Sequence, residues 1–350
     1  MKAVRTISRK YYIRQSVSIF MICCMFFNLP VVLATPQGAT QVGGTAVGGI
    51  TVGDTTTVDM GNSNKAIINW NSIDTSSSQI LQFLKAGGDF AVLNRVLSGN
   101  ATQFDGSLFG NQGSIFIVNT HGIVFGPTAV IQARNFAASG LDMANQDFMN
   151  DIYKFSGGNG LVANYGNIAA DKVALIGKQV FNAGTIQSRG GLVIMAAGDR
   201  VFLREQGSNV LVEVDGIKAP ADHIDGVPDI ASDVLNEGTI EAAAGNIVLA
   251  AGDVFSRAIE NVGTLAASGG TISASAARVG QFGTVNVDAI QGSGGNVNLT
   301  ATEVAVLGTD SITTANAGVN GDGGNIIVYS PDTAIFRDGA IVEAKGGSQS

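Results

Sequence analysis

Cysteine is almost absent from this chain of 350 residues. The two cysteines, Cys23 and Cys24, both lie near the N-terminus, in a segment that we expect to be removed. The remaining chain then has no thiol, which excludes structural disulfides and cysteine-ligated metal sites. Proline is also scarce, with six residues, so long β-strand ladders can run without interruption.

Charged residues are few, and basic residues are the minority among them. Asp and Glu number 28 against 20 Lys and Arg, and together they form 14% of the chain. An acidic chain lacks the positive surface that phosphate binding requires, so we expect no nucleic acid partner. Only two histidines are present, and neither has a second His or Cys at ligand spacing. We therefore expect no metal site, no cofactor and no catalytic residue.

The N-terminus has the parts of a signal peptide. Basic residues precede an apolar stretch from Val17 to Leu33, and small residues end this stretch at Ala34. We expect residues 1–34 to be a signal peptide that is cleaved after Ala34. The alternative is a membrane anchor, since the apolar run is near the shortest length that spans a bilayer, about 17 residues. Cleavage would leave 15 Lys and Arg against 28 Asp and Glu, a net charge of about −13.

What the sequence has in abundance is a repeat. Glycine occurs 47 times, and glycines that align successive copies recur mostly about 25 residues apart, within the range of solenoids. The aligning glycines are Gly191, Gly245, Gly270, Gly295 and Gly324. At the second, fourth and sixth places after each glycine the residues are mostly apolar, whereas those between them become polar toward the C-terminus. This period of two is typical of a strand with one buried face. The apolar columns are Val193, Ile247, Ile272, Val297 and Ile326; Met195, Leu249, Ala274, Leu299 and Val328; and Ala197, Ala251, Ala276, Ala301 and Ser330.

A second phrase, Asn-x-Gly-Thr-Ile in its clearest form, precedes these strands. Its apolar residue predicts a further inward column, and its Asn and Gly suit a tight turn. The expected column consists of Ile168, Ile186, Ile240, Leu265 and Ile290. The asparagines of the phrase predict a ladder of turn-forming residues, which comprises Asn164, Asn182, Asn236, Asn261 and Asn286.

These columns favour one fold class. Val, Ile, Thr, Asn and Gly dominate the repeats and few segments have a helical period, which disfavours helical solenoids. The L-x-x-L-x-L pattern of leucine-rich repeats is missing, and a propeller would need longer blades. We predict an all-β fold, a right-handed parallel β-helix with an N-terminal cap.

The segment from residue 66 to residue 131 carries an ordered series of short motifs. They are Asn94-Arg95-Val96, Ser98-Gly99-Asn100, Gly106-Ser107-Leu108, Ser114-Ile115-Phe116-Ile117-Val118, Asn119-Thr120-His121-Gly122-Ile123 and Phe125-Gly126-Pro127-Thr128-Ala129. In this order they resemble the amino-terminal secretion domain of filamentous-haemagglutinin-like exoproteins from two-partner secretion systems of Gram-negative bacteria. Further motifs extend the resemblance over most of the chain. They are Ala137-Ala138-Ser139-Gly140-Leu141-Asp142 with Phe148, Val180-Phe181-Asn182-Ala183-Gly184 and Ala196-Ala197-Gly198-Asp199-Arg200-Val201. The family usually has Asn-Pro-Asn-Gly-Ile where this chain has Thr120 and His121 at the second and third places.

The resemblance implies an export mechanism. In this family the unfolded exoprotein crosses the inner membrane, and a dedicated outer-membrane β-barrel transporter with periplasmic recognition domains binds its amino-terminal domain. The residues that match the secretion motif, and that we expect to take part in partner recognition, are Asn94, Arg95, Asn119, Gly122 and Ile123. Residues 35–160 would form the two-partner secretion domain with the cap and the first coils. Residues 161–350 would continue the β-helix, with a loop extruded near residues 205–233.

Two classes of function stay open at this point. The resemblance implies a non-enzymatic adhesin or haemagglutinin-like fibre, secreted or at the cell surface, that contacts a host or cell-surface glycan or protein. β-Helices also carry polysaccharide lyases and hydrolases, which act through carboxylates and a basic residue on an outer face. The nearest such group here is Arg200, Arg204 and Glu205, which a solvated coil edge explains better. We therefore expect an adhesin rather than a carbohydrate-active enzyme.

Overall fold

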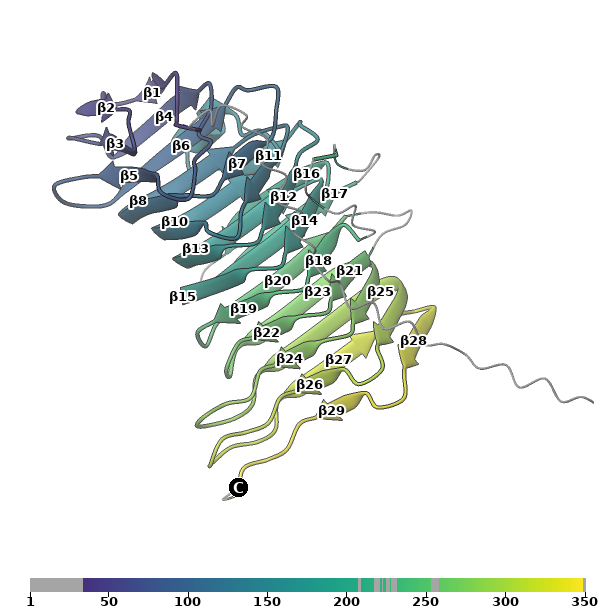
Figure 1. Ribbon diagram of the computed structural model, residues 1–350. Helices are drawn as coiled ribbons and strands as arrows, with labels where there is room; N and C mark the ends of the chain where they lie inside the picture. The colour runs from purple at the N-terminus through teal and green to yellow at the C-terminus, as the bar shows by residue number, and fades with distance from the viewer. Residues whose placement is uncertain are drawn as a thin grey trace, which may run out of the picture. The chain divides into compact units, whose positions relative to one another are not determined.

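A computed structural model describes residues 34–206, 209–216, 221, 223–224, 227, 232–252 and 258–348 (Figure 1). The expected signal peptide, residues 1–34, lies outside this part except for Ala34. Within the described residues, no helix is both long enough and apolar enough to cross a membrane. Almost all of the regular structure is strand, and most strands stack on the equivalent strand of the preceding coil.

Parallel strands stack on three faces of the coil. The first face contains β3 (Thr55–Asp59), β5 (Ile80–Leu84), the first parts of β8 (Ser107–Val118), β10 (Val130–Ser139), β13 (Asn167–Gly177) and β15 (Thr185–Ala197), then β19 (Thr239–Ala242), β22 (Thr264–Ala266), β24 (Thr284–Asn286), β26 (Ile312–Thr314) and β29 (Ile341–Glu343). The second face contains β4 (Lys65–Trp70), β6 (Phe90–Val96), the second parts of β8, β10, β13 and β15, β20 (Asn246–Ala251), the first parts of β23 (Thr271–Gln281) and β25 (Asn296–Leu307), and β27 (Asn325–Tyr329). The third face contains β7 (Thr102–Phe104), β9 (Ile123–Phe125), β12 (Leu161–Asn164), β14 (Gln179–Asn182), β18 (Val234–Asn236), β21 (Ala258–Asn261), the ends of β23 and β25, and β28 (Thr333–Phe336).

Two antiparallel strands cap the N-terminal end of this coil. β1 (Thr40–Gly44) pairs with β4, and β2 (Gly49–Thr51) pairs with β3. The pairs that link successive coils are parallel, as between β13 and β15 or between β23 and β25. The predicted parallel β-helix with an N-terminal cap is therefore confirmed. Parallel pairing also continues from β10 to β13, across the boundary expected between residues 160 and 161.

The strand register pairs the predicted columns residue by residue. Val193 lies beside Ile247, Ile247 beside Ile272, and the column continues through Val297 to Ile326. The column that runs from Met195 to Val328 stacks in the same way. Because neighbouring strands in a sheet are about 4.8 Å apart, side chains of similar size meet inside the coil and exclude water. The core is accordingly one continuous column that spans the coils.

Aromatic side chains fill the interior of the first coils. Phe104 and Phe125 lie edge to face with ring centroids 6.0 Å apart, and Phe125 contacts Phe136 at 5.6 Å. Trp70 is also fully buried. Such pairs add to the burial of their large apolar surfaces. The interior of later coils consists mainly of Ile, Leu, Val and Ala, so it changes from aromatic to aliphatic along the axis.

One predicted column is wrong at its C-terminal end. Leu265 pairs with Val285, whereas Ile290 is 82% exposed. The turn phrase of this coil is written Gln281-Phe282-Gly283, so β24 begins at Thr284, earlier than an alignment on Asn286 suggests. The chain then turns before β25, and this turn carries Ile290 into solvent.

A buried ladder of side-chain amides runs along one corner of the coil. Asn164 Nδ2 donates to Asn182 Oδ1 at 2.8 Å, and the same bond repeats through Asn236 to Asn261 at 2.7 and 2.8 Å. The next acceptor is Gln281 Oε1, at 2.7 Å from Asn261 Nδ2. The predicted ladder is thus present, but its last member is Gln281; Asn286 instead accepts from the backbone of Asp288.

A second layer covers the outside of the second face over the first coils. It consists of α1 (Asn145–Met149) and an antiparallel sheet of β11 (Tyr153–Ser156), β16 (Arg200–Gln206) and β17 (Asn209–Asp215). Outward residues beneath the layer, such as Phe116 and Ile194, are buried and apolar. In β23 and β25, beyond the layer, the same positions hold Ser273 and Asn298, which face solvent, although Ile327 at this position of β27 is apolar and 50% exposed. This layer explains the change in the interleaved residues, and β17 falls within the range expected to be an extruded loop.

Candidate functional site

Asn94, the first residue of the expected recognition set, lies inside the β-helix. It is on β6 and has no exposed surface. Its Oδ1 accepts a hydrogen bond from Trp70 Nε1 at 3.0 Å, and its Nδ2 donates to the carbonyl oxygen of Phe116 at 3.1 Å. A buried amide is tolerated when its donor and its acceptor are both paired. In the folded chain Asn94 therefore joins β4, β6 and β8.

Asn119 and Gly122 form the turn that leads to the third face. The Gly122 N–H donates to the Asn119 carbonyl at 2.9 Å, and Asn119 Oδ1 accepts from the N–H of His121 at 2.9 Å. Asn119 Nδ2 donates to the hydroxyl of Thr102 in the preceding coil at 3.0 Å. Gly122 has a φ of +112°, a conformation that favours glycine. The turn is thus defined by this Asn and this Gly, while His121 is exposed.

Ile123 follows the turn and begins β9. Its side chain is fully buried in the central core. On the outer side of the same turn, a Cβ on Gly122 would contact Ile224, which packs with Leu161 in a small apolar cluster. The turn is therefore enclosed from both sides in the folded chain.

Arg95 points outward from β6 and binds the segment between β10 and β12. Its Nε lies 2.8 Å from Asp142 Oδ1, and its Nη1 donates to Asn145 Oδ1 at 2.8 Å. Its Nη2 donates to the carbonyl of Met143. Only 14% of the Arg95 side chain is exposed. The planar guanidinium thus makes several charge-assisted bonds to one short segment.

We name residues 141–156 the strap; the strap contains α1 and β11. Lys65, on the neighbouring strand β4, binds it at the other end of α1. The Lys65 ammonium lies 2.7 Å from Asp151 Oδ1, 3.2 Å from the carbonyl oxygen of Met149, and 5.2 Å from the centre of the Phe148 ring. A cation beside the last carbonyls of a helix is favourable. Two cations therefore hold the strap against the second face.

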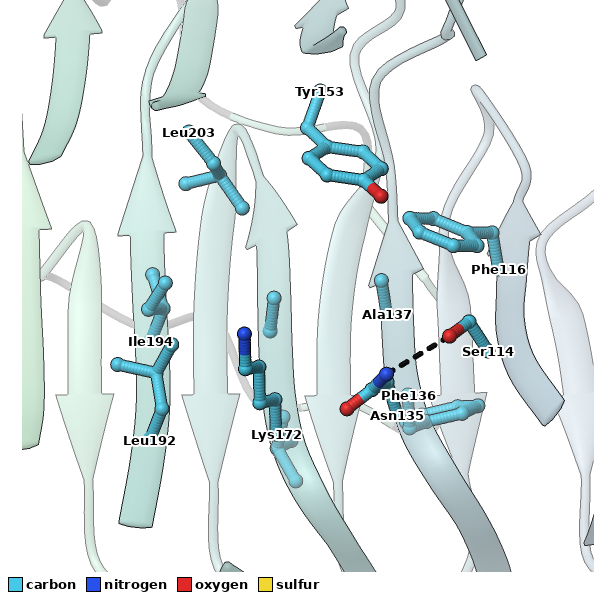
Figure 2. A pocket seen from close by; sticks show the side chains of 12 residues that line it. Ser114, Phe116, Asn135, Phe136, Ala137, Tyr153, Lys172, Leu192, Ile194 and Leu203 are labelled. Carbon is cyan, nitrogen blue, oxygen red and sulfur yellow. Dashed lines mark hydrogen bonds between the residues drawn. The ribbon is translucent and has the colours of Figure 1, made fainter. Parts of the chain in front are cut away.

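A hollow of about 110 Å³ lies where the strap and the hairpin of β16 and β17 meet the second face (Figure 2). Phe116 and Tyr153 stack beside it with ring centroids 5.5 Å apart. Leu203 and Ile194 supply further apolar lining. Asn135 Nδ2 donates to Ser114 Oγ at 2.9 Å on the polar side, as Figure 2 shows. The outer layer thus leaves part of the apolar face unfilled.

The folded chain does not gather the five expected recognition residues into one surface site. Asn94 and Arg95 are neighbours in sequence but point to opposite sides of β6, and Asn119 to Ile123 lie at the turn before the third face. The sequence prediction missed Lys65 and the role of the strap. Strap residues Asp142 and Phe148 matched the family motifs, but nothing in their spacing indicated which strands they would cover.

The described residues offer little for catalysis. No group of three or more His, Cys, Asp or Glu side chains among them could hold a metal ion. Arg200 and Arg204 lie on β16 and pair across the hairpin with Asp215 at 2.8 Å and Glu213 at 3.9 Å; the side chain of Glu205 lies outside the described part. Burial raises the pKa of Asp105. Burial, and to a lesser extent Glu237, raises the pKa of Tyr165.

A solved structure of a secretion domain shares this fold. The structure is similar to the HMW1 secretion domain from Haemophilus influenzae, with a TM-score of 0.60 and 25% identity over 89% of this chain and 98% of that one. The filamentous hemagglutinin secretion domain aligns over 89% of this chain, with a TM-score of 0.48 and 15% identity. The resemblance to two-partner secretion domains is thus confirmed.

The sequence is also similar to a curated protein. The heme/hemopexin-binding protein of Haemophilus influenzae is 28% identical over 196 residues, which cover 53% of this chain. This chain spans 20% of that protein's length. No family model matches the chain.

Proposed function

We propose that this chain is the export domain of a secreted or cell-surface exoprotein. An outer-membrane β-barrel transporter binds this domain while the domain is still unfolded. The observation that carries the proposal is the burial of the motif. Asn94, Asn119 and Ile123 have no exposed surface, and Gly122 is enclosed. A partner that reads these side chains must meet them in the unfolded chain.

A transporter can recognise an extended chain by strand addition, in which the chain pairs with the edge of a sheet in a periplasmic domain. Main-chain hydrogen bonds to a periplasmic domain would give affinity, and alternate side chains would set the register. Folding then removes the chain from its partner, because each new coil pairs with the strand edge left by the coil before it. Asn94 and Asn119 would change from partner contacts to core hydrogen bonds in this step.

An export assay tests the proposal through a matched pair of asparagines. Asn119→Ala should lower binding of the denatured chain to the transporter's purified periplasmic domains at least tenfold and should reduce secretion. Asn261→Ala removes a buried amide from a later turn and should leave binding of the denatured chain unchanged. Because the readout uses unfolded chain, loss of stability alone cannot produce the difference. Equal binding by both variants would contradict the proposal.

We further propose that the exported protein acts as an adhesin. The resemblance to haemagglutinin-like exoproteins supports this role, and the outward positions at the start of β23 and β25 hold Thr, Ser and Asn. The purified folded chain should bind cells or glycans and should not cleave acidic polysaccharide. Since a relative is named for heme and hemopexin binding, heme titration of the same sample is the natural comparison. Saturable heme binding without cell binding would overturn the adhesin role.

A further inference from the structure

The strap is a closed loop with ends that meet at the β-helix. The Gly160 N–H donates to the Gly140 carbonyl at 3.2 Å, and the Asp142 N–H donates to the Gly157 carbonyl at 2.7 Å. Within the loop, Ser156 donates to the Asp142 carbonyl at 2.8 Å. Compact loops with adjacent ends are self-contained units. The strap therefore lies on the second face without contributing a strand to the coil.

The face beneath the strap has a defined chemistry. Leu93 and Phe116 form an apolar surface that is buried together with the strap's Leu141, Met143 and Phe148. Lys65 and Arg95 flank this surface, and their side chains are only 18% and 14% exposed. The strap covers both cations, and its Asp142 and Asp151 offset the cost of holding them away from water. The face accordingly fits a short segment that combines large apolar side chains with acidic groups.

The residues of this face precede the strap in the sequence. The face is complete by Val118, whereas the strap begins at Leu141. When each new coil forms on the edge of the coil before it, as in the proposed coil-by-coil folding, this face is complete before its cover arrives. An apolar surface of this kind, left open, is a surface for interaction.

We propose that this face, between Lys65 and Arg95, first binds an acidic amphipathic peptide segment of the export transporter, and that the strap displaces this segment when it folds. The inference rests on the proposed function and names a second contact with the same partner. Charge complementarity carries it, since the strap shows which residue types the face accepts. The hollow adjoins this face at Phe116 and extends over β10, β13 and β15, so the outer layer leaves an apolar opening beside it (Figure 2).

The test uses the full chain with its strap released. Asp142→Lys together with Asp151→Lys places like charges opposite Arg95 and Lys65. A fluorescein-labelled peptide with the natural sequence of residues 141–156 serves as the probe in a fluorescence anisotropy titration. We expect the released variant to bind the peptide at least tenfold more tightly than the unaltered chain does, and this binding to weaken in high salt. Adding Arg95→Gln and Lys65→Gln should abolish it.

A second variant guards against misfolding of the first. Phe148→Ala removes the apolar anchor of the strap and keeps both cations, and it should also increase peptide binding. The peptide should then compete with the transporter's periplasmic domains for the released variant. Peptide binding that persists after both cations are removed would overturn the inference. So would peptide binding that does not compete with the periplasmic domains. A released chain that forms dimers in preference to binding the transporter would overturn it as well. If export depends on the transporter but these peptide-binding tests fail, the second contact is refuted and the proposed function stands.

Discussion

The amide ladder gives the sharpest test of the stacked coil. Asn236→Ala removes a residue from the middle of the ladder, where it accepts from Asn182 at 2.7 Å and donates to Asn261 at 2.8 Å. The Asn182 amide keeps only a long bond of 3.4 Å to the Gly184 carbonyl. Each buried polar group left without a good partner costs about 1–3 kcal/mol. Two such groups predict a loss of roughly 2–6 kcal/mol in the free energy of unfolding.

Asn325 provides the matched control. Its Nδ2 donates to Asn296 Oδ1 in the adjacent coil at 3.2 Å, but this pair is exposed. Water replaces the lost partner there, so Asn325→Ala should change stability by less than about 0.5 kcal/mol. Urea unfolding followed by far-ultraviolet circular dichroism compares the two variants. If Asn236→Ala lowers the free energy of unfolding no more than Asn325→Ala does, the buried amide ladder does not stabilise the stacked coils.

Three further tests, two of them with a matched control substitution, probe separate parts of the structure. Ile240→Ala should cost about 2–5 kcal/mol by leaving a cavity in the core, whereas Ile290→Ala should be neutral in the same urea titration because Ile290 is exposed. Gly245→Ala should lower the thermal midpoint strongly, since its Cβ would clash with the Gly191 carbonyl, while Gly99→Ala, with open space around it, should not. Tyr165 has a raised pKa and a buried hydroxyl without a hydrogen-bond partner. Its contribution to stability is present below the unfolded pKa of about 10 and is lost as pH rises above it. Tyr165→Phe should therefore reduce the alkaline loss of stability seen by thermal melting; an unchanged alkaline slope would refute this assignment.

The repeat made the fold predictable because stacking imposes size and polarity on every column. Val193, Ile247 and Ile272 could be aligned by glycines alone, and the register pairs them. The same logic failed at Ile290 because Gln281 reaches the ladder position that Asn holds elsewhere. A longer side chain with the same amide performs the same hydrogen bonding, so a search for Asn found Asn286 instead.

The site was harder to predict than the fold. The motif residues were found by resemblance, but their burial depends on contacts between coils that no local pattern reveals. Trp70 and Asn94 are 24 positions apart, and Arg95 binds a strap residue 47 positions further on. The apolar outward residues of the first coils were visible in the sequence, yet only the structure shows what covers them.

The central claim is that the transporter recognises the chain before folding buries the motif. Trp70 is the only tryptophan and bonds directly to Asn94, so its fluorescence reports burial of that residue. The chain should be diluted from denaturant while Trp70 emission and binding to the transporter's periplasmic domains are followed together. We predict that tight binding of the motif is lost at the rate at which Trp70 becomes buried, and that the contact left with the face beneath the strap is weaker and ends when the strap folds. A fully folded chain that binds as tightly as the unfolded one would contradict the account.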